Sequence, residues 1–181
     1  KKVIYDFRQN DLINGGQGAP LTPIFHKLLE NKLKIRPTIF VNIGGIINTT
    51  TIYSDGSLFA TDTGPGMCLV DQWVKTNTNK KYDVDGSLAE LGIINTIILE
   101  QALENFSAPL NNLETKNKKI VRSFDTSDFN LSFVRGLSLE DGAATLIEFT
   151  VQTLLLNLNI NKDEKIILCG GGRKNSFLVE R

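Results

Sequence analysis

An aspartate followed by two glycines that flank a proline is the segment best suited to chemistry. Asp62 precedes Thr63, Gly64, Pro65 and Gly66, where a strand-like run gives way to helical spacing. Glycines there expose backbone N–H groups at a helix N-terminus, a position that favours a phosphate. An aspartate beside them suits a general base acting on a hydroxyl group or a water. The alternative is that Asp62 only caps the helix or forms an Asx turn.

A second glycine pair stands between two strand-like runs. Gly44 and Gly45 separate residues 38–43 from residues 46–53, with Asn42 just before the pair. This arrangement predicts a β-hairpin. Without side chains at its tip, the main-chain amides can approach an anion such as a phosphoryl group. An ordinary tight hairpin turn explains the same residues.

A third glycine cluster follows another strand-like run. Gly170, Gly171 and Gly172 come directly after residues 165–169, and Asn175 follows three residues later. A glycine turn between a strand and a helix can admit a nucleotide. The spacing fits neither the dinucleotide fingerprint nor the P-loop, and close helix-to-strand packing is the alternative.

The remaining composition excludes several classes of protein. The 181 residues carry 20 Lys plus Arg and 20 Asp plus Glu, which excludes a strongly basic nucleic-acid binder or a polybasic membrane-surface protein as the default. His26 is the single histidine, and Cys68 and Cys169 lie far apart. A catalytic triad would therefore need His26, which is expected to pack or to face water rather than to catalyse, and no His/Cys metal cluster can form. No apolar run is long enough to span a membrane and no leader opens the chain, so we expect a cytoplasmic protein.

The elements that must position these residues alternate between strand and helix, which indicates an α/β fold. Three short antiparallel strands are predicted before the DTGPG segment, and an amphipathic helix after it. Strands are predicted at 3–7, 38–43, 46–53, 58–61 and 165–169; helices are predicted around 24–29, 67–74, 88–103 and 146–158, with a linker at 32–37.

The motifs in combination resemble the anhydro-N-acetylmuramic acid kinase family. They are DFRQNDLINGGQGAPL at 6–21, NIGGIIN at 42–48, DTGPG at 62–66 and CGGGRKN at 169–175. The resemblance implies the fold of the sugar kinase, actin and Hsp70-type ATPases: an α/β, actin-like or ribonuclease H-like fold, here incomplete and mainly the second lobe, with a mixed sheet and flanking helices. It also implies that residues 1–36 end the first lobe and residues 37–181 belong to the second.

The resemblance further implies a reaction and a role for each motif. ATP, with Mg²⁺, would phosphorylate O6 of an anhydro amino sugar while water opens the 1,6-anhydro bridge, giving N-acetylmuramic acid 6-phosphate in cell-wall recycling. Asp62 would be the general base, and Arg8 and Gln17 would hold the sugar. The nucleotide would be bound at its phosphates by Asn42, Gly44, Gly45 and Gly64, and at its adenosine by Gly170, Gly171, Gly172 and Asn175. No metal ligand is implied within this chain.

Departures from the family pattern leave other interpretations open. DFRQND replaces the commoner DFRRRD, residues 116–139 lack the usual STGRE-type stretch, and nothing matches the N-terminal GxMSGTSxDG loop. The chain is therefore expected to be a central portion of such a kinase. It could instead be an inactive fragment that binds nucleotide or a complementing chain, or another sugar-kinase-like ATPase. A homodimer is a further possibility, and no nucleic-acid or membrane partner is expected.

Overall fold

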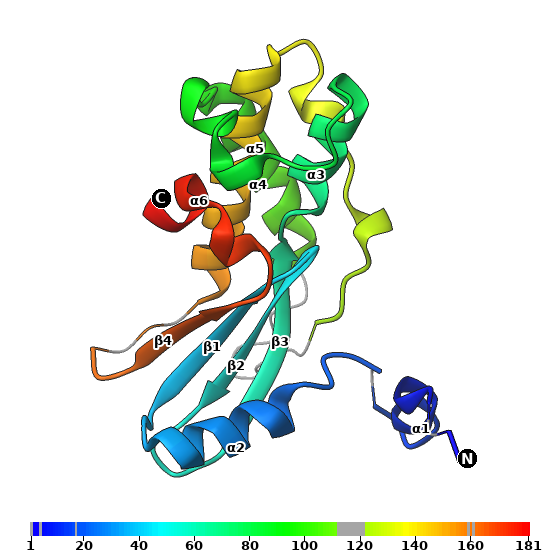
Figure 1. The fold of residues 1–181 in the computed structure, drawn as a ribbon, viewed down its shortest axis with the longest axis vertical. Helices are drawn as coiled ribbons and strands as arrows, with labels where there is room; N and C mark the ends of the chain where they lie inside the picture. Colours follow the sequence, from blue (N-terminus) through cyan, green and yellow to red (C-terminus); the bar gives the residue numbers. More distant parts are fainter. Residues whose placement is uncertain (1, 4, 17, 112–121, 159, 161) are drawn as a thin grey trace.

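The computed structural model describes residues 2–3, 5–16, 18–111, 122–158, 160 and 162–181. A four-stranded mixed sheet forms one end of the molecule and a group of helices forms the other (Figure 1). The strand order is β3-β2-β1-β4, with β1–β2 and β2–β3 antiparallel and β4 parallel to β1. The strands are β1 (Thr38–Ile43), β2 (Ile46–Ile52), β3 (Leu58–Pro65) and β4 (Lys165–Cys169). The predicted α/β class and mixed sheet are confirmed.

The helices follow the predicted order with different limits. The α-helices are α1 (Phe7–Ile13), α2 (Pro23–Leu33), α3 (Cys68–Asn77), α4 (Thr96–Asn111), α5 (Leu139–Asn157) and α6 (Ser176–Glu180). Short 3-10 turns occupy Val84–Gly86, Ala89–Leu91, Thr126–Asp128, Ser132–Val134 and Gly172–Lys174. Within the described part of the chain, no helix combines the length and apolarity needed to cross a bilayer.

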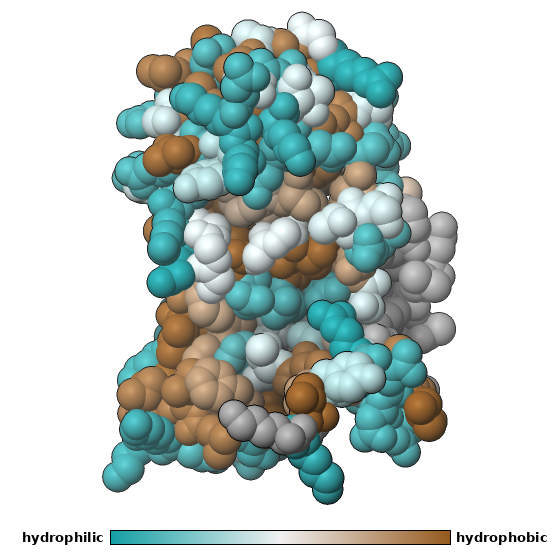
Figure 2. All heavy atoms as spheres, turned by 45° about the vertical axis from the view of Figure 1, so that its right-hand side comes forward, coloured by the Kyte–Doolittle hydropathy of each residue, from teal (hydrophilic) through white to brown (hydrophobic). Residues whose placement is uncertain are grey.

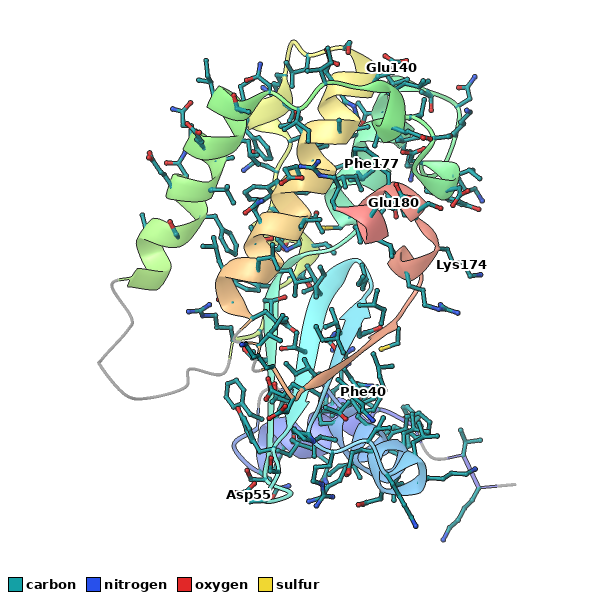
Figure 3. All side chains as sticks on the ribbon, turned by 90° about the vertical axis from the view of Figure 1, so that its left-hand side faces the viewer. Phe40, Asp55, Glu140, Lys174, Phe177 and Glu180 are labelled. Atoms are coloured by element: carbon teal, nitrogen blue, oxygen red, sulfur yellow. The ribbon has the colours of Figure 1, made fainter. Side chains whose placement is uncertain are left out.

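The two faces of the sheet are covered by different helices. Ile39, Val41 and Ile43 alternate along β1 and belong to the core that α3 and α5 complete. Phe40 lies on the opposite face, where its ring stacks on His26 of α2 with centroids 4.5 Å apart (Figure 3). Burial lowers the pKa of His26. The prediction that this histidine packs is confirmed, while the predicted lobe boundary near residue 36 remains a prediction.

Two secondary-structure predictions are wrong. The single helix expected over 88–103 is split, because the backbone is extended at Gly92 and the N–H groups of Ile93 and Asn95 donate to Asp141 and Thr145 of α5 instead of continuing a helix. The helix resumes only at Thr96. The strand expected at 3–7 is also absent from the described residues of that segment, 3 and 5–7: Phe7 instead begins α1, and no described strand lies beside the segment to pair with it.

Gly142 on α5 allows the Trp73 ring to pack closely against the helix. A Cβ at Gly142 would overlap the indole ring, whose Nε1 donates to the carbonyl of Leu139 at 2.9 Å. Glycine to alanine inside a helix normally stabilises a protein by up to about 1 kcal/mol. Here we expect Gly142→Ala to lower the free energy of unfolding by roughly 2 kcal/mol through overpacking.

Thermal denaturation measures this effect, with a Tm decrease of roughly 4–8 °C expected for a chain of this size. Asn105→Ala is the control, since Asn105 is an exposed position of α4 and should gain a few tenths of a kcal/mol. An unchanged or higher Tm for Gly142→Ala would contradict this packing.

Candidate active site

A row of polar residues crosses all four strands at the end nearest the helices. Cys169, Asn42, Asn48 and Asp62 are successive partners in the strand register. Directly opposed residues share a sheet face, and Asn42 Nδ2 donates to Asn48 Oδ1 at 3.4 Å. The row lies on the face that Phe40 shares, because Phe40 and Asn42 are two residues apart on one strand.

A β-bulge directly after Asp62 separates its face of the sheet from that of Gly64. Ile47 pairs with Gly64 while Asn48 pairs with Asp62, which leaves Thr63 as an extra residue. The third strand therefore continues to Pro65 rather than ending at Thr61 as predicted. Because one inserted residue reverses which face a side chain meets, Asp62 points to the polar row while Gly64 packs on α5.

Gly64 has a packing explanation in this position. A Cβ there would lie 2.9 Å from Thr153 Oγ1 on α5, so a side chain would force Thr153 or the strand to shift. The structure thus places Gly64 on the opposite face from Asp62, the residue with which the sequence groups it.

The Asp62 carboxylate is almost enclosed and asymmetrically held. The residue is 5% exposed, and its Oδ2 accepts the backbone N–H of Phe124 at 2.8 Å. Its pKa is raised by burial, although the Phe124 N–H and the positive charge of Arg8 act in the opposite direction. No described group donates to Oδ1, so that oxygen is left to receive a proton.

Residues 122–128 pack beside Asp62 and the hairpin tip, a contact that the sequence did not reveal. The Asp62 N–H donates to the carbonyl of Arg122 at 3.0 Å, and farther along Thr126 comes close to the hairpin tip at Gly45. Asp125 and Asp128 form a capping box at the 3-10 turn. That capping pattern was the one readable signal, and it marks a local turn without showing which distant strand the turn meets.

The three glycine bends pack against one another at the end of the sheet (Figure 1). Gly66 N donates to Gly45 O at 2.8 Å, and Met67 N donates to Gly44 O at 2.8 Å. A Cβ at Gly170 would overlap the carbonyl of Ile43. The bends that the sequence grouped by composition are therefore neighbours. Gly66, Gly170 and Gly172 leave no room for a side chain, because neighbouring atoms occupy the space.

A pocket of about 410 Å³ opens beside these bends, within the size range of small-molecule sites. Predicted nucleotide-binding residues from two of the bends form part of its wall, whereas Asp62 does not border it. The lining residues are Ile43, Gly44, Gly45, Met67, Asp71, Tyr82, Asp83, Asp85, Gly171, Gly172, Lys174 and Asn175. The hairpin tip thus lies between the two features: Gly44 and Gly45 border the pocket, and Asn42, two residues before Gly44 on the same hairpin, belongs to the polar row.

Asn175 lines the pocket and has one amide donor without a partner among the described residues. It is 4% exposed, and its Oδ1 accepts the N–H of Leu178 at 2.9 Å, which caps α6. Its Nδ2 is buried with no hydrogen-bond partner among the described residues. A buried donor without an acceptor is costly and calls for an explanation, and a bound ligand with an acceptor atom would provide one.

The remaining described residues considered from the sequence do not line the pocket. Arg8 is an exposed residue of α1 that acts on Asp62 through its charge, and Gln17 lies outside the described residues. Cys68 and Cys169 are free and half-buried, and burial raises the pKa of both thiols, so neither is an activated nucleophile. The described ranges contain no group of three His, Cys, Asp or Glu side chains that could hold a metal ion.

Comparison with known proteins agrees with the motifs. A family profile described as anhydro-N-acetylmuramic acid kinase matches residues 1–181. The chain belongs to the anhydro-N-acetylmuramic acid kinase family. Membership in this family places the mixed sheet in the actin-like ATPase superfamily, as the resemblance implied.

Several curated members of the anhydro-N-acetylmuramic acid kinase family are similar over nearly the whole chain. A protein of that name from Pelagibacter ubique is 48% identical, with 99% of this chain and 48% of the relative covered. Relatives with the same name from Agrobacterium fabrum and Zymomonas mobilis are 39% and 38% identical, each covering 98% of this chain and 47% of the relative. The chain spans about half the length of the curated relatives it matches.

Proposed function

We propose that this chain supplies the general base and part of the nucleotide site of an ATP-dependent kinase. Its substrate would be 1,6-anhydro-N-acetylmuramic acid, phosphorylated at O6 with hydrolytic opening of the anhydro ring, in cell-wall recycling. The observation that carries the proposal, within the family assignment, is the nearly enclosed Asp62 carboxylate on one sheet face with Asn42, beside the glycine hairpin. Because ATP is the phosphoryl donor, we expect the protein to act in the cytoplasm.

The reaction needs one base and careful positioning. The oxygen of a water bonds to the anomeric carbon, the bond from that carbon to O6 breaks, and O6 bonds to the γ-phosphorus as ADP leaves. The water proton passes to Asp62 Oδ1, while the Phe124 N–H fixes Oδ2 and hence the direction of the carboxylate. Arg8 and Gln17 would hold the sugar and its lactyl carboxylate, for which a guanidinium is well suited.

The nucleotide would extend from the hairpin into the pocket. Asn42, Gly44 and Gly45 would serve the phosphates, of which Gly45 is exposed and donates its N–H to no acceptor in the described part of the chain. Gly64, which the sequence grouped with them, packs on α5 instead. The adenosine would lie against Gly170, Gly171, Gly172 and Asn175. Mg²⁺ usually binds through phosphates, waters and one or two carboxylates, so we expect it to enter as MgATP.

The raised pKa of Asp62 predicts how the rate depends on pH. The base must be ionised, so kcat/KM is expected to fall as the pH drops through this pKa, above the usual aspartate value of about 4. Arg8 lowers the pKa of Asp62. Arg8→Gln should therefore move the acid limb to higher pH, whereas Arg8→Lys, which keeps the charge, should leave it in place. If the acid limb of kcat/KM has the same pH in Arg8→Gln as in the parent, the assignment of this limb to Asp62 would be contradicted.

A chimera tests the function most directly. This chain would replace the matched half of the Pelagibacter ubique relative, and the purified chimera would be incubated with ATP, Mg²⁺ and the anhydro sugar. Mass spectrometry is expected to detect N-acetylmuramic acid 6-phosphate, with the unaltered relative as the positive control. A folded chimera that forms no product, or that prefers an unbridged hexose, would overturn the proposal.

A second candidate is a binding fragment without turnover, and the uncovered apolar side of α2 favours it. Ile24, Phe25, Leu28 and Leu33 of α2 are each more than half exposed, and hydrophobic atoms gather at this end of the molecule (Figure 2). Exposed apolar patches of this kind mark interaction surfaces. We propose that a complementing half of the kinase covers them, with a second copy of the chain as the alternative.

Complementation in trans distinguishes the two candidates. The chain alone and the chain mixed with the remaining half of the relative would be assayed for product and for molecular mass. Product from the chain alone would overturn the fragment candidate, and product only from the mixture would support a complementing half. A dimer of the chain that excludes the other half would favour self-association.

A further inference from the structure

Three aspartates border the pocket, but only one has an unused carboxylate. Asp83 is buried and accepts the N–H of Leu88 at 2.9 Å, which makes it a structural cap. Asp85 accepts the hydroxyl of Ser176. The half-buried Asp71 side chain accepts no hydrogen bond from any described residue, although it lines the same pocket.

The position of Asp71 relates it to the part of a nucleotide next to the phosphates. Its N–H donates to the carbonyl of Met67 at 2.8 Å, and the Met67 N–H donates to the hairpin carbonyl of Gly44 at 2.8 Å. Asp71 therefore lies one helical turn, about 6 Å along α3, from the hairpin tip. If the phosphates lie at that tip, the ribose is the next group along the nucleotide.

The charge of the pocket disfavours phosphate at this point. Asp71, Asp83 and Asp85 outnumber Lys174, which extends from the connection between β4 and α6 (Figure 3). Burial and the charge of Asp83 both raise the pKa of Asp71, as expected for a carboxylate that no donor stabilises. A carboxylate in such surroundings would accept hydrogen bonds from hydroxyl groups of a ligand.

Asn175 lines the same pocket, and its buried Nδ2 has no acceptor among the described residues. It needs an acceptor, whereas Asp71 needs a donor. A single ligand that satisfies both must carry hydroxyl or amine donors together with ring or ether acceptors. A nucleoside has this combination, and acidic side chains are known partners of ribose hydroxyls in nucleotide sites.

We infer that Asp71 determines nucleotide specificity by accepting a hydrogen bond from a ribose hydroxyl group. This inference rests on the proposed function, because it assumes that ATP occupies the pocket. Asp71 then distinguishes ribonucleotides from deoxyribonucleotides, a selection separate from the chemistry at Asp62.

Calorimetric titration of the chain and of the chimera with ADP, 2′-deoxyADP and 3′-deoxyADP tests the inference. We expect ADP to bind about 10-fold or more tightly than at least one deoxy analogue, since hydrogen bonds to charged groups are the stronger ones. The two analogues show which hydroxyl is recognised. Asp71→Ala should reduce the preference to within about twofold, and Asp71→Asn, which keeps a carbonyl acceptor, should give an intermediate value.

Asp85→Asn is the matched control, because it removes a negative charge at the same pocket and Asn tolerates the positive φ of 59° found there. Its preference for ADP should equal that of the parent. Equal binding of ADP and both analogues by the parent, or a full preference retained in Asp71→Ala, would overturn the inference. Sugar phosphorylation by the chimera would stand in either case, whereas no adenine nucleotide binding by either protein would overturn both proposals.

Discussion

Asp62→Asn in the chimera is expected to reduce turnover of the anhydro sugar by at least about 100-fold, the usual contribution of a general base. The amide cannot take the proton of the attacking water, but its carbonyl oxygen can still accept the N–H of Phe124. The fold should therefore survive. The measurement is the initial rate of sugar phosphate formation at saturating ATP and sugar.

Stability separates this loss from unfolding. The folded-state pKa of Asp62 is raised, so the folded protein favours the protonated acid; that preference stabilises the fold below the unfolded pKa and is lost as the pH rises through the folded pKa. A neutral Asn is consequently expected to keep or raise the Tm at pH 7. Asp55→Asn, at an exposed turn, should leave the rate within about twofold, since surface changes have small effects.

Two outcomes would remove Asp62 from the mechanism. One is turnover of Asp62→Asn within threefold of the parent chimera. The other is a Tm decrease large enough to account for the lost activity, which would make the carboxylate a structural group.

Gly66→Ala should have the largest effect on the architecture of the site. A Cβ at Gly66 would overlap the carbonyl oxygen of Gly44 and lie 3.2 Å from that of Gly45, so the backbone of the hairpin tip must move. We expect the free energy of unfolding to fall by about 3 kcal/mol and the Tm by roughly 6–12 °C. Because displacements near 1 Å in a reacting site cost about 100-fold, turnover at a temperature where the variant is folded should fall by a similar factor.

Gly171→Ala is the comparison for this prediction. A Cβ at Gly171 meets no atom within 4 Å, and its φ of −71° suits any residue. Its free energy of unfolding should differ from that of the parent by no more than about 0.5 kcal/mol, the usual range for a surface change, so the Tm should be nearly unchanged. Equal Tm values for the two alanine variants would show that the hairpin does not depend on close packing at Gly66.

Local patterns were enough to predict most of the elements and the family. The β1–β2 hairpin, α3 and β4 appear where residue type and spacing indicate them, because a turn or an amphipathic face is encoded within a few neighbouring residues. The glycine clusters were visible for the same reason. Each marks a backbone that must adopt an unusual conformation or approach another chain segment closely.

The contacts between those elements were decided by tertiary structure. The pairing of β3 with β2 places Asp62 opposite Asn48, and the bulge at Thr63 turns Gly64 to the other face. Neither feature can be read from the DTGPG letters alone. The placement of Phe124 against Asp62 joins residues 62 positions apart. The pocket likewise combines a carboxylate on α3 and an Asn175 Nδ2 group that have no hydrogen-bond partner among the described residues.

The sequence by itself therefore determined which residues could do chemistry, and the tertiary structure determined which of them meet. Spacing along a chain specifies the periodicity of a helix or strand and the turns that end it. It does not specify register, bulges or the burial of a polar atom, because these depend on the packing of segments that are distant in the sequence.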